Sequence, residues 1–239
     1  MLTKGIVLHN ISEEQARYCL LHQSIIEAKF GLQISAQHKP CEYDDLLQML
    51  NEIYSSFPKG LIKEITTYYK NCGIKTYVKF LNKESMVSGS FYFNGKEIIL
   101  YYYPQSKDQF GEWVIGHELG HLVHKYLNDL HGSEKLKNEW INLNNGLKYG
   151  IKNWTSQHKQ YFVRKYSLTN YAEDFATVVE LLSEISVTGY QCNLVGKNCS
   201  ALKKKIDLLL NTLLTHSKSF RKLKSNRDKE YLMLRMAME

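Results

Sequence analysis

The segment from Val114 to Val123 reads VIGHELGHLV and places the pattern HExxH between apolar residues. In an α-helix, residues four apart lie one turn apart on the same face, so His117 and His121 can direct their imidazoles at one metal ion. Without such a partner, burying two histidines and a glutamate among apolar neighbours would cost free energy. The sequence therefore predicts a buried helix that carries a metal centre. The alternative interpretation is a pair of core or surface histidines on an amphipathic helix.

The pattern also suggests which metal is bound and what it is used for. Two neutral imidazoles, one further protein ligand and one open position form the usual ligand set of catalytic zinc. Glu118 follows His117 directly and can reach a water at the open position as a general base. We therefore expect Zn²⁺ as the cofactor, with His117 and His121 as two of its ligands.

The third ligand has to come from outside the HExxH segment or from its next turn. The extended pattern HExxHxxGxxH is excluded, because His124 and Leu127 occupy the positions where it requires glycine and histidine. His124 lies one turn beyond His121 and is one candidate. Glu173 is the better candidate, because it stands early in an apolar helical pattern and its carboxylate can face inward. The alternative is that Glu173 and Asp174 only favour a helix N-terminus through the helix dipole.

A second segment, residues 166–176, supports the interpretation of the HExxH segment. Tyr166 precedes Glu173 by seven residues, and Glu173 begins the sequence Glu-Asp-Phe-Ala. Together with HELGH, this combination resembles the gluzincin-type peptidases related to anthrax lethal factor. It is also similar to a group of zinc-binding peptidases with the signature YAxTxxxEDFAExFA, and residues 138–150 resemble the linking segment of that group. The resemblance covers about residues 87–185.

The resemblance implies a role for each residue of the candidate site. His117, His121 and Glu173 would be the zinc ligands, Glu118 the general base, and Tyr166 a hydrogen-bond donor to the developing oxyanion. The chain departs from the family at one position. A second glutamate usually follows four residues after the ligand, where this chain has Thr177, so either Asp174 or no residue would fill that role.

The order of predicted elements is helices, then a sheet, then helices. Two segments, 87–93 and 96–103, flank Asn94-Gly95, the strongest short hairpin signal, and 74–81 is rich in β-branched and aromatic residues. We expect 128–165 to be irregular apart from one short helix, and to shape a functional surface. Helical spacing and capping signals predict helices over 12–30, 43–56, 61–70, 108–127, 170–188, 200–216 and 226–238.

These elements predict an α+β fold with a small antiparallel sheet, an active-site helix and flanking N- and C-terminal helices. The resemblance implies a zincin-like catalytic region over 73–199. A helical extension over 1–72 and a basic helical segment over 200–239 would complete one compact domain. With 44% hydrophobic and 23% charged residues, the composition argues against intrinsic disorder. No apolar run approaches the ~20 residues that span a bilayer.

The net charge of +7 belongs mainly to the C-terminal segment, where residues 200–239 hold 10 Lys+Arg and 4 Asp+Glu. Such a segment could contact nucleic acid or an anionic membrane, but it lacks interleaved aromatic residues and any recognition motif. We favour a solvated helix face. Because the charge excess and the HExxH region occupy separate segments, we also expect residues 200–239 to be dispensable for the metal site.

The cysteines and the N-terminal residues indicate the cellular compartment in which the protein resides. The five cysteines are irregularly spaced and include no CxxC pair, so we expect free thiols in a reducing compartment. A disulfide between Cys192 and Cys199 is the alternative in an oxidising one. The first residues carry no Sec-type signal, so we expect a cytoplasmic protein or export by a non-Sec route, as for an injected effector.

These observations predict a zinc-dependent endopeptidase acting on a protein or peptide substrate. The aromatic hairpin is then a candidate sheet edge that holds the substrate as an added strand, although aromatic cross-strand pairs would explain it as well. One alternative is a cytoplasmic regulatory metalloprotease of the anti-repressor type, which also uses HELGH-like helices. Another is a non-catalytic basic binding module with a structural metal. An open coordination position favours the enzyme, and a closed set of four ligands favours the module.

Overall fold

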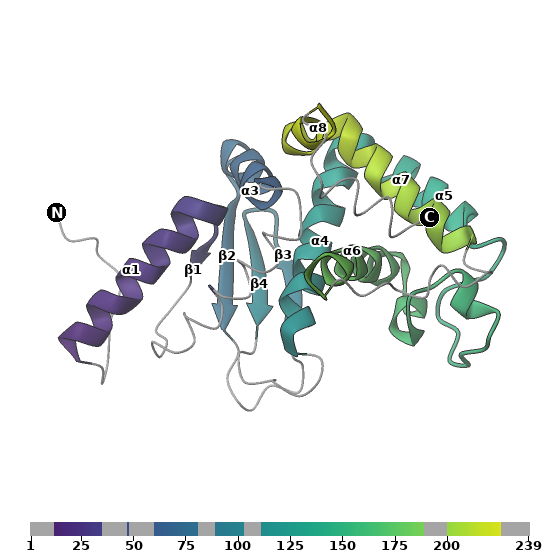
Figure 1. Ribbon diagram of the computed structural model, residues 1–239, viewed down its shortest axis with the longest axis horizontal. Coiled ribbons are helices and arrows are strands. Elements are labelled where there is room, and N and C mark those ends of the chain that lie inside the picture. Colours follow the sequence, from purple (N-terminus) through teal and green to yellow (C-terminus); the bar gives the residue numbers. More distant parts are fainter. Residues whose placement is uncertain are drawn as a thin grey trace.

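The computed structural model describes residues 12–34, 47, 60–80, 89–102, 111–188 and 200–225. Over these ranges the chain is mixed α+β, with a small four-stranded sheet and helices on either side of it (Figure 1). Helix α1 (Glu13–Phe30) lies beside β1 (Gln33–Ile34) at one end of the sheet. Helix α4 (Gly111–His131) lies next to β3 at the other end and packs against α6 (Tyr171–Thr188).

The sheet has the strand order β1-β2-β4-β3. Its other strands are β2 (Lys75–Phe80), β3 (Gly89–Phe93) and β4 (Glu97–Tyr102). Strands β1, β2 and β4 are parallel, and only β3 runs antiparallel to its neighbour. The prediction of an antiparallel sheet is therefore wrong for the sheet as a whole and correct only for the hairpin. The chain reverses direction after β2 and again after β3, so β4 runs in the same direction as β2. Because β4 rather than β3 lies next to β2, the β2–β4 pair is parallel.

The hairpin itself forms where the sequence predicts it. The Asn94 side-chain oxygen accepts hydrogen bonds from the backbone N–H groups of Lys96 and Glu97, at 3.0 and 2.8 Å. Gly95 has a φ of +88°, a left-handed conformation that favours glycine. Since β3 is the edge strand of the hairpin, one of its sides is free of any strand among the described residues.

The N-terminal helices follow local signals. Ser12 and Gln15 form a complete capping box at the start of α1, and Gly31 ends the helix in a left-handed conformation. Helix α3 (Leu61–Asn71) confirms the prediction over 61–70. The helices predicted over 43–56 and 226–238 lie outside the described residues, apart from Leu47, and so do Cys192 and Cys199.

The stretch predicted to be irregular contains the one short helix expected there, preceded by the last residues of α4. Helix α4 continues to His131, and α5 (Ser133–Asn142) follows after Gly132. Only two short 3₁₀ turns occur beyond it, His158–Gln160 (η1) and Lys165–Leu168 (η2). The turn η2 leads directly into α6 and so places Tyr166 close to the helix that carries Glu173.

The C-terminal helices belong to the same core as the HExxH helix. Helix α7 (Ser200–His216) confirms the prediction over 200–216 and contributes buried side chains to a core shared with α4 and α6: Leu202, Ile206, Leu209, Leu210 and Leu213. Lys205 is also fully buried, so the expected solvated basic face does not include it. No helix in the described ranges is both long and apolar enough to cross a bilayer.

Helix α8 (Lys218–Ser225) is absent from the sequence predictions, although Ser217 caps it locally: its hydroxyl accepts a hydrogen bond from the backbone N–H of Phe220 at 3.0 Å. The carboxylate of Glu64 on α3 accepts hydrogen bonds from the backbone N–H groups of Lys218 and Ser219, at 2.7 and 2.6 Å. The hydroxyl of Ser217 donates to the same carboxylate at 3.0 Å. Ser217 is the local signal that could have found this helix, whereas the Glu64 part of the cap lies more than 150 residues away in sequence.

Candidate metal centre

The candidate metal centre lies where α4 packs against α6. A Cβ placed on Gly120 would lie 2.8 Å from the carbonyl oxygen of Ala176 and 2.9 Å from its Cα. Only glycine therefore allows the two helix backbones to approach this closely. The glycine of HELGH thus has a packing role, which brings the first turn of α6 onto the histidine face of α4.

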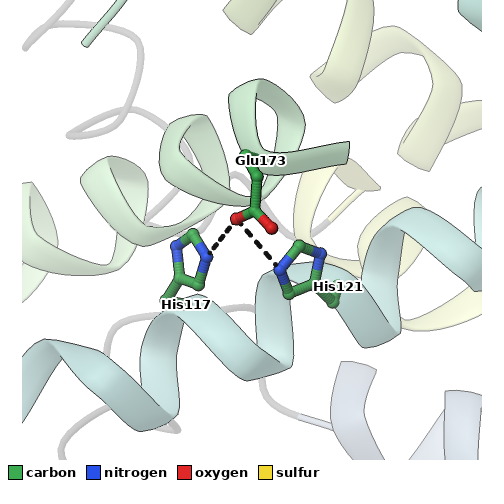
Figure 2. A group of neighbouring side chains, drawn as sticks. All are labelled: His117, His121 and Glu173. Carbon is green, nitrogen blue, oxygen red and sulfur yellow. Dashed lines mark hydrogen bonds and ion pairs between the residues drawn. The ribbon is translucent and has the colours of Figure 1, made fainter. Parts of the chain in front are cut away.

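Figure 2 shows the three predicted ligands pointing toward one another from these two helices. Glu173 Oε2 lies 2.9 Å from His117 Nε2 and 3.3 Å from His121 Nε2. The three candidate ligand atoms all lie within 4.8 Å of one another. The side chains of His117, His121 and Glu173 are 8%, 11% and 17% exposed, so the cluster is largely shielded from solvent.

A second carboxylate supports His117 from behind, and sequence reasoning did not identify it. Glu180 Oε2 lies 3.0 Å from His117 Nδ1. By accepting the Nδ1 proton, it leaves the Nε2 lone pair free to bind a metal, as carboxylates behind metal-binding histidines commonly do. Glu180 stands seven residues after Glu173 on α6, two turns along the same face, and that spacing is the signal that could have found it.

Glu180 is itself held by a cation. The guanidinium of Arg164 donates to Glu180 Oε2 at 2.7 Å and also lies 5.8 Å from the centre of the Tyr166 ring. Arg164 therefore links the carboxylate behind His117 to the tyrosine in front of it. The arrangement holds the Glu180 carboxylate in an orientation that faces the imidazole.

Glu118 is buried beside the cluster, with only 4% of its surface exposed. Its Oε2 atom has no hydrogen-bond partner among the described residues. Burial raises the pKa of Glu118 to about 8; the charge of His117 opposes this shift, and the charges of Glu173 and Glu180 add to it. A buried carboxyl group with an unused oxygen suits a base that exchanges a proton with a small molecule in the site.

Strand β3 lies directly over this glutamate. A Cβ on Gly89 would fall 2.8 Å from Glu118 Oε1 and 2.4 Å from Val114 Cγ1. Farther along the strand, the rings of Phe91 and His121 are 5.8 Å apart. The edge strand of the hairpin therefore follows the same face of α4 that carries the two candidate ligands, His117 and His121.

Tyr166 lies beside the cluster and is 49% exposed, with its ring 5.6 Å from that of His117. Burial raises the pKa of its phenol, and the charges of Glu173 and Glu118 raise it further. The phenol therefore stays protonated near neutral pH and can donate a hydrogen bond into the site. The structure thus places Tyr166 beside the three predicted ligands.

Two other predicted candidates do not join the cluster. His124 packs between the helices, with its ring 4.8 Å from Phe175, and its Nε2 lies 2.9 Å from the Asn128 side-chain amide. Burial lowers the pKa of His124 to about 3, and the charge of His121 lowers it further. Asp174 turns away from the metal ligands and pairs with Lys205 at 2.6 Å. Neither His124 nor Asp174 is therefore placed to assist the metal.

Thr177, at the family's usual glutamate position, does not contact the histidines either. Its hydroxyl lies 2.7 Å from the Ser167 hydroxyl and donates to the Glu173 carbonyl oxygen at 2.9 Å. It therefore ties the turn before α6 to the helix. Glu180, three residues farther along, is the carboxylate that meets His117.

The cluster attracts positive charge. Burial alone would lower the pKa of His117, but hydrogen bonds to Glu173 and Glu180 outweigh it and raise the pKa to about 9. Burial alone would raise the pKa of Glu173, but hydrogen bonds from His117 and His121 hold it far below its ordinary value. Carboxylates that stabilise a proton on an imidazole would stabilise a metal cation in the same place.

The residues present suit zinc better than a hard cation. Two imidazole nitrogens and one carboxylate oxygen are borderline donors of the kind that zinc prefers, whereas calcium and magnesium take oxygen ligands. Three protein ligands leave one coordination position for water or substrate. No protein-family model matches the sequence, and no curated protein matches it either.

Proposed function

We propose that this protein is a zinc-dependent endopeptidase with a gluzincin-type, zincin-like catalytic region. The observation that carries the proposal is the convergence of His117, His121 and Glu173 from two helices onto one point. The buried carboxyl group of Glu118 and the phenol of Tyr166 flank that point, as peptide hydrolysis requires.

Zinc, bound by His117, His121 and Glu173, would supply a Lewis acid that makes a water acidic near neutral pH and polarises a peptide carbonyl. Glu118 takes a proton from the attacking water as the water oxygen bonds to the carbonyl carbon. Tyr166 donates a hydrogen bond to the carbonyl oxygen while negative charge develops there. When the C–N bond breaks, Glu118 gives its proton to the leaving amine nitrogen.

The edge strand β3 is the candidate platform for the substrate. An extended peptide that pairs with its free side would extend the sheet beside the HExxH helix. Gly89 brings the strand backbone close to Glu118, so a peptide bond paired near this residue would lie within reach of the base. The exposed side chains of Tyr92 and Phe93 offer apolar contacts to such a peptide.

A purely structural metal site is less well supported. Structural zinc takes four protein ligands, and the described residues bring three together. In that alternative the unpartnered carboxyl oxygen of Glu118 would also have no purpose. The longer gap between His121 and Glu173, and the tyrosine before Glu173, likewise favour the gluzincin type over the anti-repressor type.

The test combines metal analysis with a search for cleavage products. Wild-type protein should bind about one zinc per chain and generate new peptide N-termini in a mixture of denatured proteins. Glu118→Gln, loaded with zinc in the same way, should generate none of them. A wild-type chain that binds no zinc, or identical N-termini in both samples, would overturn the proposal.

A further inference from the structure

Behind the metal centre lies an ion pair with no solvent exposure on either side. Lys205 Nζ of α7 donates to Asp174 Oδ2 of α6 at 2.6 Å, and both side chains are 0% exposed. The same Asp174 oxygen accepts hydrogen bonds from the Trp140 indole and the Tyr149 phenol, each at 2.8 Å. Lys205 also donates to the Tyr161 carbonyl oxygen at 2.7 Å. Four separate parts of the chain therefore meet at one carboxylate oxygen.

A buried ion pair of this kind contributes little net stability to the fold. Removing two charges from water costs about as much as their attraction returns, and apolar side chains of similar size often stabilise a core better. The pair is also imperfectly satisfied, because Asp174 Oδ1 has no hydrogen-bond partner within the described ranges. What the pair does provide is a fixed orientation of the Asp174 side chain, because every donor approaches the same oxygen.

The fixed orientation of Asp174 affects the metal centre through its neighbour in sequence, Glu173. Asp174 follows Glu173 in the first turn of α6, and consecutive side chains on an α-helix point about 100° apart. Holding Asp174 toward α7 and α5 therefore sets the rotation of this turn and aims Glu173 at α4. A small rotation of the turn would move the Glu173 carboxylate away from both histidines.

We propose that Lys205 is a positioning residue for the metal centre, and that it couples the docking of α7 to metal binding by holding Asp174. The proposal rests on zinc binding at the site described above. It reverses the expectation that residues 200–239 are dispensable for that site. Because coupling is reciprocal, bound zinc should in turn hold α7 more firmly in place.

The first measurement is the zinc dissociation constant of the full chain, by competition with a chromophoric chelator. Lys205→Met should weaken zinc binding by ~10-fold or more, the scale seen when residues behind metal ligands are removed. Lys204→Met is the matched control on the same helix, because Lys204 is exposed, and it should bind zinc like wild type.

A second control separates positioning from general weakening of the core. Leu209→Ala removes a buried side chain from α7 without touching Asp174. It should lower the melting temperature of the zinc-free protein but leave the zinc dissociation constant unchanged. If Leu209→Ala weakens zinc as much as Lys205→Met does, Lys205 has only a structural role and the proposal is wrong.

Should Lys205→Met fail to fold, the double variant Lys205→Met/Asp174→Leu decides, because it leaves no buried charge without a partner. It should fold and still bind zinc ~10-fold more weakly than wild type. Wild-type zinc affinity in a folded single or double variant would overturn the inference. A wild-type chain that binds no zinc would instead overturn the proposed function.

The reciprocal effect has its own readout, hydrogen exchange of the backbone amides in α7. Zinc should slow this exchange in wild type and in Lys204→Met, but not in Lys205→Met. Equal protection by zinc in all three proteins would show that α7 and the metal centre are not coupled through Lys205.

Discussion

Glu180 Oε2 lies 3.0 Å from Nδ1 of His117, on the side of the imidazole opposite to Glu173. One glutamate therefore meets each nitrogen of the same ring, and both come from α6. Glu173 faces the metal position, whereas Glu180 fixes the proton on Nδ1. This division of roles also explains how the site can do without a carboxylate at Thr177.

The first prediction concerns that second glutamate. Glu180→Ala should weaken zinc binding by ~10–100-fold, because His117 loses the acceptor that sets its tautomer and orientation. Thr177→Val is the matched control at the position where the family has a glutamate, and it should leave zinc affinity unchanged. Chelator competition on both variants checks the prediction, and it fails if Thr177→Val shows the larger effect.

The second prediction concerns the helix crossing. Gly120→Ala places a methyl group against the Ala176 backbone, so α4 and α6 must separate. We expect a loss of about 1–3 kcal/mol in unfolding free energy and weaker zinc binding. Leu127→Ala, a buried change farther along α4, should destabilise the protein by about 2–5 kcal/mol while zinc affinity holds. Denaturant unfolding and metal titration together distinguish the two effects.

The third prediction separates catalysis from folding. Neither Glu118 nor Tyr166 is a proposed ligand, so Glu118→Gln and Tyr166→Phe should retain zinc and the wild-type melting temperature. Glu118→Gln should abolish turnover, and Tyr166→Phe should lower kcat by ~10²–10³-fold with little change in KM. Steady-state cleavage of a peptide found by the N-terminus search measures both. Wild-type turnover by Tyr166→Phe would remove the seven-residue spacing to Glu173 as support for the family resemblance.

The fourth prediction is a pH dependence away from the metal centre. Burial raises the pKa of Glu64, but hydrogen bonds from Ser219, Lys218 and Ser217 outweigh it, so the pKa lies below its ordinary value of 4.5. A carboxyl group with a lowered folded-state pKa contributes stability above its unfolded pKa, and that contribution is lost as the pH falls through the folded value.

We therefore expect Glu64→Gln to lower the melting temperature at neutral pH, with the difference from wild type shrinking as the pH falls below about 4.5. Thermal unfolding of both proteins across this range checks the sign. A difference that grows on acidification would show that the Glu64 carboxylate does not hold the start of α8.

Local patterns in the sequence determined the elements that carry the site. Residues four apart in HExxH share a helix face by geometry alone, and Asn94-Gly95 closes a hairpin through its own dihedral preferences and side-chain hydrogen bonds. The predicted ligand set of His117, His121 and Glu173 converges in the structure, although its three members come from two helices. The zinc itself and the peptidase activity stay predictions until they are measured.

Only the tertiary structure decided the remaining features, because each depends on groups distant in sequence. The parallel pairing of β2 with β4 follows from strand order, which the alternation of side chains along a strand does not encode. Glu180 meets His117 across 63 positions, and Lys205 meets Asp174 across 31. Periodicity tells which face of a helix is apolar, but it does not tell which polar group on another helix will be buried against that face.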